Sequence, residues 1–358
     1  MPIYDQSYKR WEGSFKSHAL RWWVISKYGI KTAFKRKVVR GLFIFALLPL
    51  VASAIYIYGL THIGKVSGFV QAVGGGGGSG IPQFSSKRYE VEIDGEAEPF
   101  IQQLDEERLR WESTATGVRV FVPEGENSKK ILAMAKLTGT TISRLVPPGV
   151  KASFYNGYLN RVFIFLFVLL LVVGSGLIAK DVKFNALQIY LAKPITGIEY
   201  IVGKLGIVVF FLVMITLVPG IFLFLLQAIL VGDSLYLRHY WWVLGAICAY
   251  SLLVIFSGTL LVLALSAFSR NVRSAWGGAA VLFWFSPMVA EMLRSSTWND
   301  NYLLIAFPYN WVRVGETIFG LPATRDVPWE WSLLIVVGTM VLCAWALVYR
   351  IRAVRVVK

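Results

Sequence analysis

The chain has 358 residues, of which 56% are hydrophobic, and its mean hydropathy is +0.59. A soluble domain of this size is less apolar, so the composition predicts a polytopic membrane protein. The formal net charge of +15 does not indicate nucleic-acid binding, because the excess Lys and Arg lie beside apolar segments, where membrane topology and anionic lipid explain them.

Residues 1–40 are polar and basic and contain no early apolar segment, so no cleavable signal peptide is expected. Within them, 13–38 is predicted to form a cytoplasmic amphipathic helix that lies on the inner leaflet. Lys27, Lys31 and Lys35 follow one another at intervals of four residues on its polar face. Its apolar face holds Trp22, Trp23, Ile25, Ile30, Ala33 and Phe34. A basic flank that only sets membrane topology is the alternative interpretation.

Six segments are apolar enough for helices that cross a membrane, which need about 20 mostly apolar residues each. They are 41–61, 158–179, 201–230, 241–267, 275–292 and 331–349. The third and fourth are long enough to tilt or to extend past the bilayer, and the fifth is short enough to be partly re-entrant. The predicted fold class is therefore an all-α polytopic membrane protein with six transmembrane helices.

The distribution of Lys and Arg predicts how these spans are oriented. The side with the excess consists of 1–40, the 180–204 loop, the 268–274 turn and the 350–358 tail. Together these segments hold 20 basic and four acidic residues, whereas the 62–157 insert on the other side holds 11 of each. Both termini are therefore predicted to be cytoplasmic, in a plasma or inner membrane, with the insert outside.

The 62–157 insert, between the first and second spans, is predicted to hold a small extracytoplasmic α+β domain. It contains a flexible glycine-rich linker, GGGGGSG, at 74–80. Alternating or helical patterns predict strands at 87–94, 117–124 and 140–149 and helices at 99–113 and 127–137. A domain of about 75 residues is marginally stable alone. This one is therefore expected to rest on the membrane, on a second copy or on an extracytoplasmic partner.

The 180–204 loop is the long connection between spans that is best suited to face another protein. Asp181 is expected to cap a short helix there, and Pro194 to end it. Phe184, Leu187 and Leu191 recur along it at helical spacing, which predicts an amphipathic helix. Such a helix, held under the membrane by two spans, is suited to pass force from a soluble motor to the spans.

The start of the third span carries a T-x-x-E pattern at 196–199, which predicts a capping box. Gly197, Gly203 and Lys204 superficially resemble a nucleotide-binding P-loop. The spacing is one residue too long, and Leu205 stands where Ser or Thr is required. The sequence therefore predicts no nucleotide binding by this chain.

Proline lies inside three predicted spans, at Pro49, Pro219 and Pro287. Each removes a backbone hydrogen bond and permits a kink, which is interpreted either as a gate or as a static bend. The spans also hold the neutral polar residues Ser53, Thr216, Gln227, Ser251, Ser257, Thr259 and Ser266. Such residues join helices more often than they line a pathway.

No set of residues in the sequence predicts catalysis, cofactor binding or metal binding. Cys248 and Cys343 lie in apolar segments, and His18, His62 and His239 are scattered. Neither a nucleophile with its base nor a facing pair of carboxylates is recognisable. The chain is therefore not expected to be an enzyme.

The 180–204 loop resembles the first cytoplasmic loop of type-2 permeases of ATP-binding-cassette (ABC) exporters. The matching residues are Asp181, Leu187, Tyr190, Leu191, Pro194, Ile195, Tyr200, Gly203 and Lys204. In that family the loop carries the coupling helix that docks on the ATPase subunit. The resemblance therefore implies an ATPase-coupling interface here. The residues expected in it are Asp181, Phe184, Leu187, Tyr190, Leu191, Pro194, Tyr200, Gly203 and Lys204.

The six-span layout and the basic N-terminal helix extend this resemblance to most of the chain, apart from the 62–157 insert. It implies a permease subunit that forms an export pathway as a homo- or heterodimer, while separate ATPase subunits bind ATP and Mg²⁺. Family members also close the outer end of the pathway with short re-entrant helices, and 302–319, in the 293–330 outer loop, resembles these. The alternative is a non-transporting scaffold that relays ATPase motion to an extracytoplasmic partner through the insert.

Overall fold

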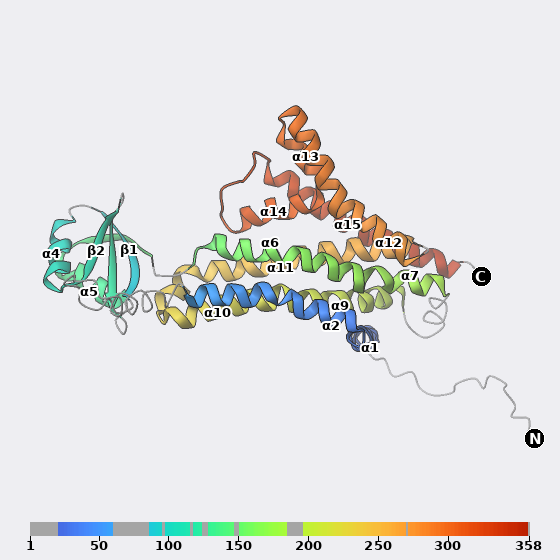
Figure 1. Ribbon diagram of the computed structural model, residues 1–358, viewed down its shortest axis with the longest axis horizontal. Coiled ribbons are helices and arrows are strands. Elements are labelled where there is room, and N and C mark those ends of the chain that lie inside the picture. The colour runs from blue at the N-terminus through green and yellow to red at the C-terminus, as the bar shows by residue number, and fades with distance from the viewer. Residues whose placement is uncertain are drawn as a thin grey trace, which may run out of the picture.

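The computed structural model describes residues 21–59, 86–94, 97–114, 117–123, 128–146, 150–184, 196–269 and 271–356. The molecule is elongated: long helices run side by side, and a small sheet domain stands at one end of them (Figure 1). Six helices in the described residues are long and apolar enough to cross a membrane, which confirms the predicted architecture. Each is longer than the segment that predicts it, because the polar turns that flank the apolar stretch are also helical.

The six spans differ in how deeply they lie within the protein. The second, third and fourth are Ala152–Lys183, Gly197–Val231 and Ser234–Phe268, and 61%, 56% and 67% of their most apolar stretches are buried. The first, fifth and sixth are Lys37–Gly59, Val272–Thr297 and Trp329–Ile351, with only 17%, 17% and 22% buried. The three central spans therefore form the core, and the other three present broad apolar faces to lipid or to a partner.

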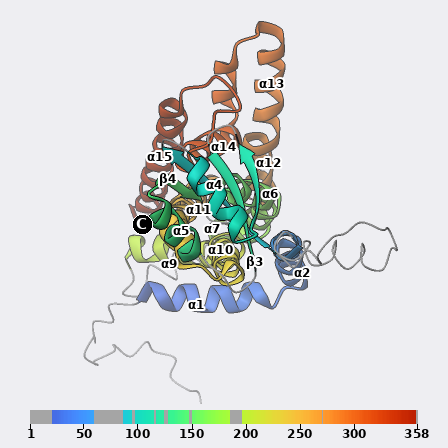
Figure 2. The ribbon, with the colours of Figure 1, turned by 90° about the vertical axis from the view of Figure 1, so that its left-hand side faces the viewer.

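The N-terminal helix α1, Arg21–Phe34, runs across the bundle rather than along it (Figure 2). After a turn, α2, Lys37–Ala46, begins the first span, and helix resumes over 48–59. The predicted helix at 13–38 therefore ends too late, because its last residues belong to α2. Its first residues, 13–20, lie outside the described part of the chain.

The two faces of α1 have different surroundings. Lys27, Lys31 and Lys35 are exposed, in agreement with their predicted polar face. On the other side, Ala33 is buried, and the ring of Phe34 lies 4.8 Å from a phenylalanine ring of α9, Gly197–Ile215. Part of the predicted apolar face thus packs on the third span.

The core spans are built from helices joined by short irregular turns. They comprise α6 (Ala152–Leu169), a π-helical turn (Leu170–Gly174), α7 (Ser175–Lys183), α9, α10 (Leu217–Val231) and α11 (Ser234–Phe268). Beside the π-helical turn, Ser266 Oγ accepts hydrogen bonds from the backbone N–H groups of Ile178 and Ala179, at 3.2 and 3.0 Å. It also donates to the carbonyl of Ser175 at 2.6 Å. Ser266 therefore joins two helices, which is the favoured interpretation of polar residues in the spans.

Each of the three span prolines lies at an irregularity in its helix. Pro49 follows the turn at Leu47, and Pro219 lies in the first turn of α10, just after α9 ends. Pro287 lies in the first turn of α13, Ser286–Thr297, directly after a π-helical turn. Proline has no N–H for the preceding turn, which accounts for the breaks. Their role as gates stays a prediction.

The fifth and sixth spans enclose the 293–330 segment. They comprise α12 (Val272–Ala280), a π-helical turn (Val281–Phe285), α13, a 3₁₀ helix (Asp300–Ile305), α14 (Phe307–Ile318) and α15 (Trp329–Val356). The fifth span is continuous over 26 residues, which is longer than the predicted segment 275–292 and long enough to cross a membrane. That it is partly re-entrant stays a prediction. In its polar last turn, Arg294 Nε donates to Glu291 Oε2 at 3.0 Å, a pairing that adds modest support to the helix. Short helices do occupy most of 302–319, and α14 packs against α11 and α15.

The insert is a four-stranded antiparallel sheet with order β2-β3-β1-β4. Its elements are β1 (Ser86–Asp94), α4 (Glu98–Glu106), β2 (Arg110–Thr114), β3 (Gly117–Pro123), α5 (Ser128–Thr138) and β4 (Thr141–Val146). Phe100 and Leu104 of α4 and Ile131 and Met134 of α5 pack on the buried valines of the sheet. This small core confirms the α+β insert.

One element of the insert was predicted incorrectly. The helix expected over 99–113 ends at Glu106, and its last residues form β2, which pairs with β3. The reason is a left-handed residue, Arg108 (φ 53°), after which Leu109 N–H bonds back to the Leu104 carbonyl at 2.9 Å. This is the hydrogen bond of a helix-terminating Schellman turn.

Candidate functional site

The predicted coupling interface lies in the loop between α7 and α9. Leu187, Tyr190, Leu191 and Pro194 fall within 185–195, outside the described residues, so their arrangement stays a prediction. The structure does describe both ends of the loop. These ends contain the other predicted interface residues: Asp181, Phe184, Tyr200, Gly203 and Lys204.

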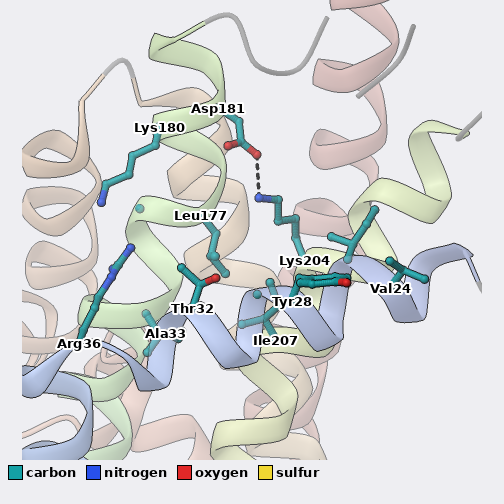
Figure 3. A pocket seen from close by; sticks show the side chains of 14 residues that line it. Val24, Tyr28, Thr32, Ala33, Arg36, Leu177, Lys180, Asp181, Lys204 and Ile207 are labelled. Carbon is teal, nitrogen blue, oxygen red and sulfur yellow. Dashed lines mark ion pairs between the residues drawn. The ribbon is translucent and has the colours of Figure 1, made fainter. Parts of the chain in front are cut away.

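Asp181 belongs to the last turn of α7, so the prediction that it caps a separate helix is wrong. The second span continues past its apolar stretch to Lys183, which places Asp181 inside the helix. Its carboxylate points toward Lys204 of α9 (Figure 3), and Asp181 Oδ2 lies 2.7 Å from Lys204 Nζ. The same oxygen accepts a hydrogen bond from Tyr200 OH at 2.7 Å. One carboxylate therefore ties together the two helices that carry the loop.

The side chains of the cluster formed by Asp181, Tyr200 and Lys204 are largely shielded from solvent. The side chains of Lys204 and Asp181 are 9% and 16% exposed, and Tyr200 is fully buried. The Lys204 ammonium also lies 5.4 Å from the centroid of the Tyr200 ring, within cation–π range. Because burying charges is costly unless they are paired, this geometry favours one arrangement of the loop ends.

The end of the loop is fixed by the predicted capping box, which the structure confirms. Thr196 Oγ1 accepts from the Glu199 N–H at 3.2 Å, and Glu199 Oε2 accepts from the Thr196 N–H at 2.7 Å. The pair satisfies backbone donors that helix formation leaves free. The start of α9 is thereby set about two turns before Lys204.

Gly203 places the N-terminal helix directly against the loop. A Cβ at Gly203 would lie 2.8 Å from the Cβ of Ile25, so only glycine permits this approach of α1 to α9. Ser26 Oγ donates to the Gly203 carbonyl at 2.8 Å. In the structure Gly203 forms a contact between α1 and the third span, and its predicted place in the ATPase interface stays a prediction.

Exposed apolar side chains flank the described ends of the loop. Phe184, the residue that follows α7, is 71% exposed, and Ile198 in the first turn of α9 is 61% exposed. Lys183 is exposed beside Phe184. Among the predicted interface residues that the structure describes, Phe184 is therefore the one whose side chain a partner can reach directly.

Two buried charged sites were missed by sequence reasoning. Asp233, at the N-terminus of α11, accepts from Tyr89 OH of the insert at 2.6 Å and from Ser128 N–H at 3.0 Å. It also caps its own helix through the Leu235 N–H at 3.0 Å. The only signal was an aspartate after Gly232, which has a left-handed φ of 61°. That pattern predicts a cap but not a contact with a domain distant in sequence.

The second missed site lies in α14, where Arg313 Nη1 is 3.5 Å from Glu316 Oε2 and both side chains are buried. Arg313 Nε also donates to the Val327 carbonyl at 2.7 Å, which secures the segment after α14. Opposite charges three residues apart in an apolar helix were the available signal. Within the described residues, no group of three or more His, Cys, Asp or Glu side chains could hold a metal ion.

The family model described as ABC-2 family transporter protein matches residues 23–310, which is most of the chain and includes most of α1, the insert and the loop. A search of curated proteins finds no match.

Proposed function

The chain belongs to the ABC-2 transporter family, and from this membership we propose that it is the permease subunit of an ABC exporter driven through the 180–204 loop. Two such chains would form the pathway, and two ATPase subunits, which bind ATP and Mg²⁺, would dock on the cytoplasmic side. The observation that carries the coupling proposal is the buried tie of Asp181 to Lys204 and Tyr200.

The cluster provides a route for force. A partner that binds the loop contacts residues between α7 and α9, and those helices are held together directly behind the loop. Because α1 packs on α9 around Gly203, a displacement of the loop would also move α1. In the proposed mechanism, closure of the ATPase subunits pushes the loop, and the second and third spans reorient as one unit.

The proposal of a dimer rests on the three poorly buried spans. Six helices enclose only half of the pathway proposed here, and the first, fifth and sixth spans present broad apolar faces. A second copy would cover part of one such face and lipid the remainder.

The first experiment is affinity purification of the chain from its native membrane, with mass spectrometry of the proteins that accompany it. We expect a stoichiometric ATPase with a P-loop. Leu187→Asp and Phe184→Asp should then abolish ATPase recovery while the chain stays in the membrane. Leu137→Asp is the matched control, because Leu137 is 78% exposed on the insert, at the opposite end of the molecule. Undiminished ATPase recovery with both loop variants would refute docking at the loop.

A second candidate function is a scaffold that relays ATPase motion to an extracytoplasmic partner without transport. The contact of Asp233 with Tyr89 and Ser128 favours it, because this contact fixes the insert to the longest helix of the bundle. The two functions separate in sealed vesicles that contain the purified complex. ATP-dependent movement of a co-purified small molecule or lipid supports the exporter, and hydrolysis without such movement supports the scaffold.

A further inference from the structure

A cavity of about 470 Å³ opens between α1, α7 and α9 (Figure 3). These helix ends lie at the end of the bundle opposite the insert (Figure 1). Its inner wall is apolar and includes Ala33 of α1, Val173 and Leu177 of the second span, and Ile207 of α9. Although α1 packs closely on α9, it makes hardly any contact with α7, and the cavity occupies the space between them. The cavity is therefore a cleft with an apolar inner wall.

The mouth of this cavity is positively charged. Arg36 and Lys180, which approach it from α2's N-cap and from α7, both extend toward the same opening (Figure 3). Both side chains are exposed, and neither forms an ion pair with any residue that the structure describes. Asp181, the acidic residue in the lining, is already held by Lys204 and Tyr200. Two cations therefore converge without an anion between them, which favours an anionic ligand.

The position of the cavity restricts the source of that ligand. Arg36 directly precedes the first span, which begins at Lys37, and Lys180 lies in the last turn of the second span, which ends at Lys183. Both cations thus lie where helices leave the membrane, in the headgroup layer. The flanking residues Val24 and Tyr28 of α1 are 53% and 67% exposed, as expected for an interfacial helix.

We propose that this cavity binds an anionic phospholipid of the leaflet that surrounds this end of the bundle, opposite the insert. Its phosphate would lie between Arg36 and Lys180, and an acyl chain would follow Leu177 and Ile207 into the apolar part. A lipid in this position would fill the space between α1 and α7 and brace the helices behind the loop. The inference stands apart from the proposed coupling to an ATPase, because it requires only the cavity and a membrane.

The test uses the full chain, purified in mild detergent from membranes that contain phosphatidylglycerol and phosphatidylcholine, with retained lipid identified by native mass spectrometry. We expect the unmodified chain to retain phosphatidylglycerol selectively. A basic residue near an anionic headgroup contributes about 1 kcal/mol, so Arg36→Gln/Lys180→Gln should lower phosphatidylglycerol affinity by about 30-fold. Lys31→Gln, which removes an exposed lysine of α1 outside the cavity lining, is the matched control and should leave retention unchanged.

A second variant tests the apolar half of the site. Leu177→Trp fills the cavity but keeps both cations, so it should also lose the lipid while the protein elutes as before in gel filtration. The proposal would be overturned if Arg36→Gln/Lys180→Gln retained as much phosphatidylglycerol as the unmodified chain, or if Lys31→Gln lost as much as the double variant. A thermal-unfolding measurement distinguishes lipid from soluble anions. If inorganic phosphate raised the unfolding temperature as much as phosphatidylglycerol does, the cavity would be a site for soluble anions and the proposal would be wrong.

Discussion

Replacing Lys204 by methionine is expected to destabilise the protein more than removing the hydroxyl group of Tyr200. The Asp181 carboxylate, whose side chain is only 16% exposed, would then keep Tyr200 OH as its partner but lose its counter-ion. Removing one partner of a buried ion pair costs about 3–5 kcal/mol. Tyr200→Phe removes one hydrogen bond to a charged acceptor, which is worth about 1.5–3 kcal/mol. Lys204→Met should therefore be the more damaging of the two.

The double variant Asp181→Asn/Lys204→Met distinguishes this explanation from a simple loss of packing. Neutralising the carboxylate removes the unpaired charge, so the double variant should be more stable than Lys204→Met alone, with a coupling free energy of about 2 kcal/mol. The free energy of unfolding is measured for the purified chain by denaturant titration, followed by tryptophan fluorescence. A cost for Lys204→Met no greater than that for Tyr200→Phe would contradict the importance of the unpaired charge, as would a double variant as unstable as the sum of its single changes.

Four further results are expected. Gly29→Val, whose Cβ would overlap a side chain of α9, should expose α1 to protease, whereas Gly41→Val, with open space around it, should not. Burial raises the pKa of Asp233, but hydrogen bonds from Tyr89 and from backbone N–H groups outweigh this and hold the pKa below 3.8. The insert should therefore stay docked until the pH falls below about 4, where hydrogen exchange should detect its release. Burial and Asp233 also raise the pKa of Tyr89 above 10.0, so docking should weaken again as pH rises past about 10, and Asp233→Ala should release the insert throughout. Arg108→Gly should raise the free energy of unfolding of the insert by about 1 kcal/mol, because glycine adopts the left-handed conformation without strain; an unchanged or lower thermal midpoint would contradict this.

The spans and the strands at 87–94 and 117–124 were predictable because their patterns are local: long apolar stretches and alternating residues. The capping box at 196–199 was predictable for the same reason. β2 was not, because a helical composition continues through Arg108, and only the left-handed turn there separates helix from strand. Contacts between distant segments were also beyond the sequence pattern. Nothing near Asp181 indicates that its partner is Lys204 rather than water.

The Asp233 contact has a mechanical consequence. The Asp233 carboxylate caps α11 and also binds the first residue of α5 and a tyrosine of β1. The insert is therefore attached directly to the N-terminus of α11. With 35 residues, α11 is about 50 Å long, and a tilt of about 10° around its far end would displace the insert by about 9 Å. Small rotations of the bundle would therefore produce larger displacements of the insert. Spin labels on the exposed face of α5 in two copies of the chain would record that swing as a change in distance.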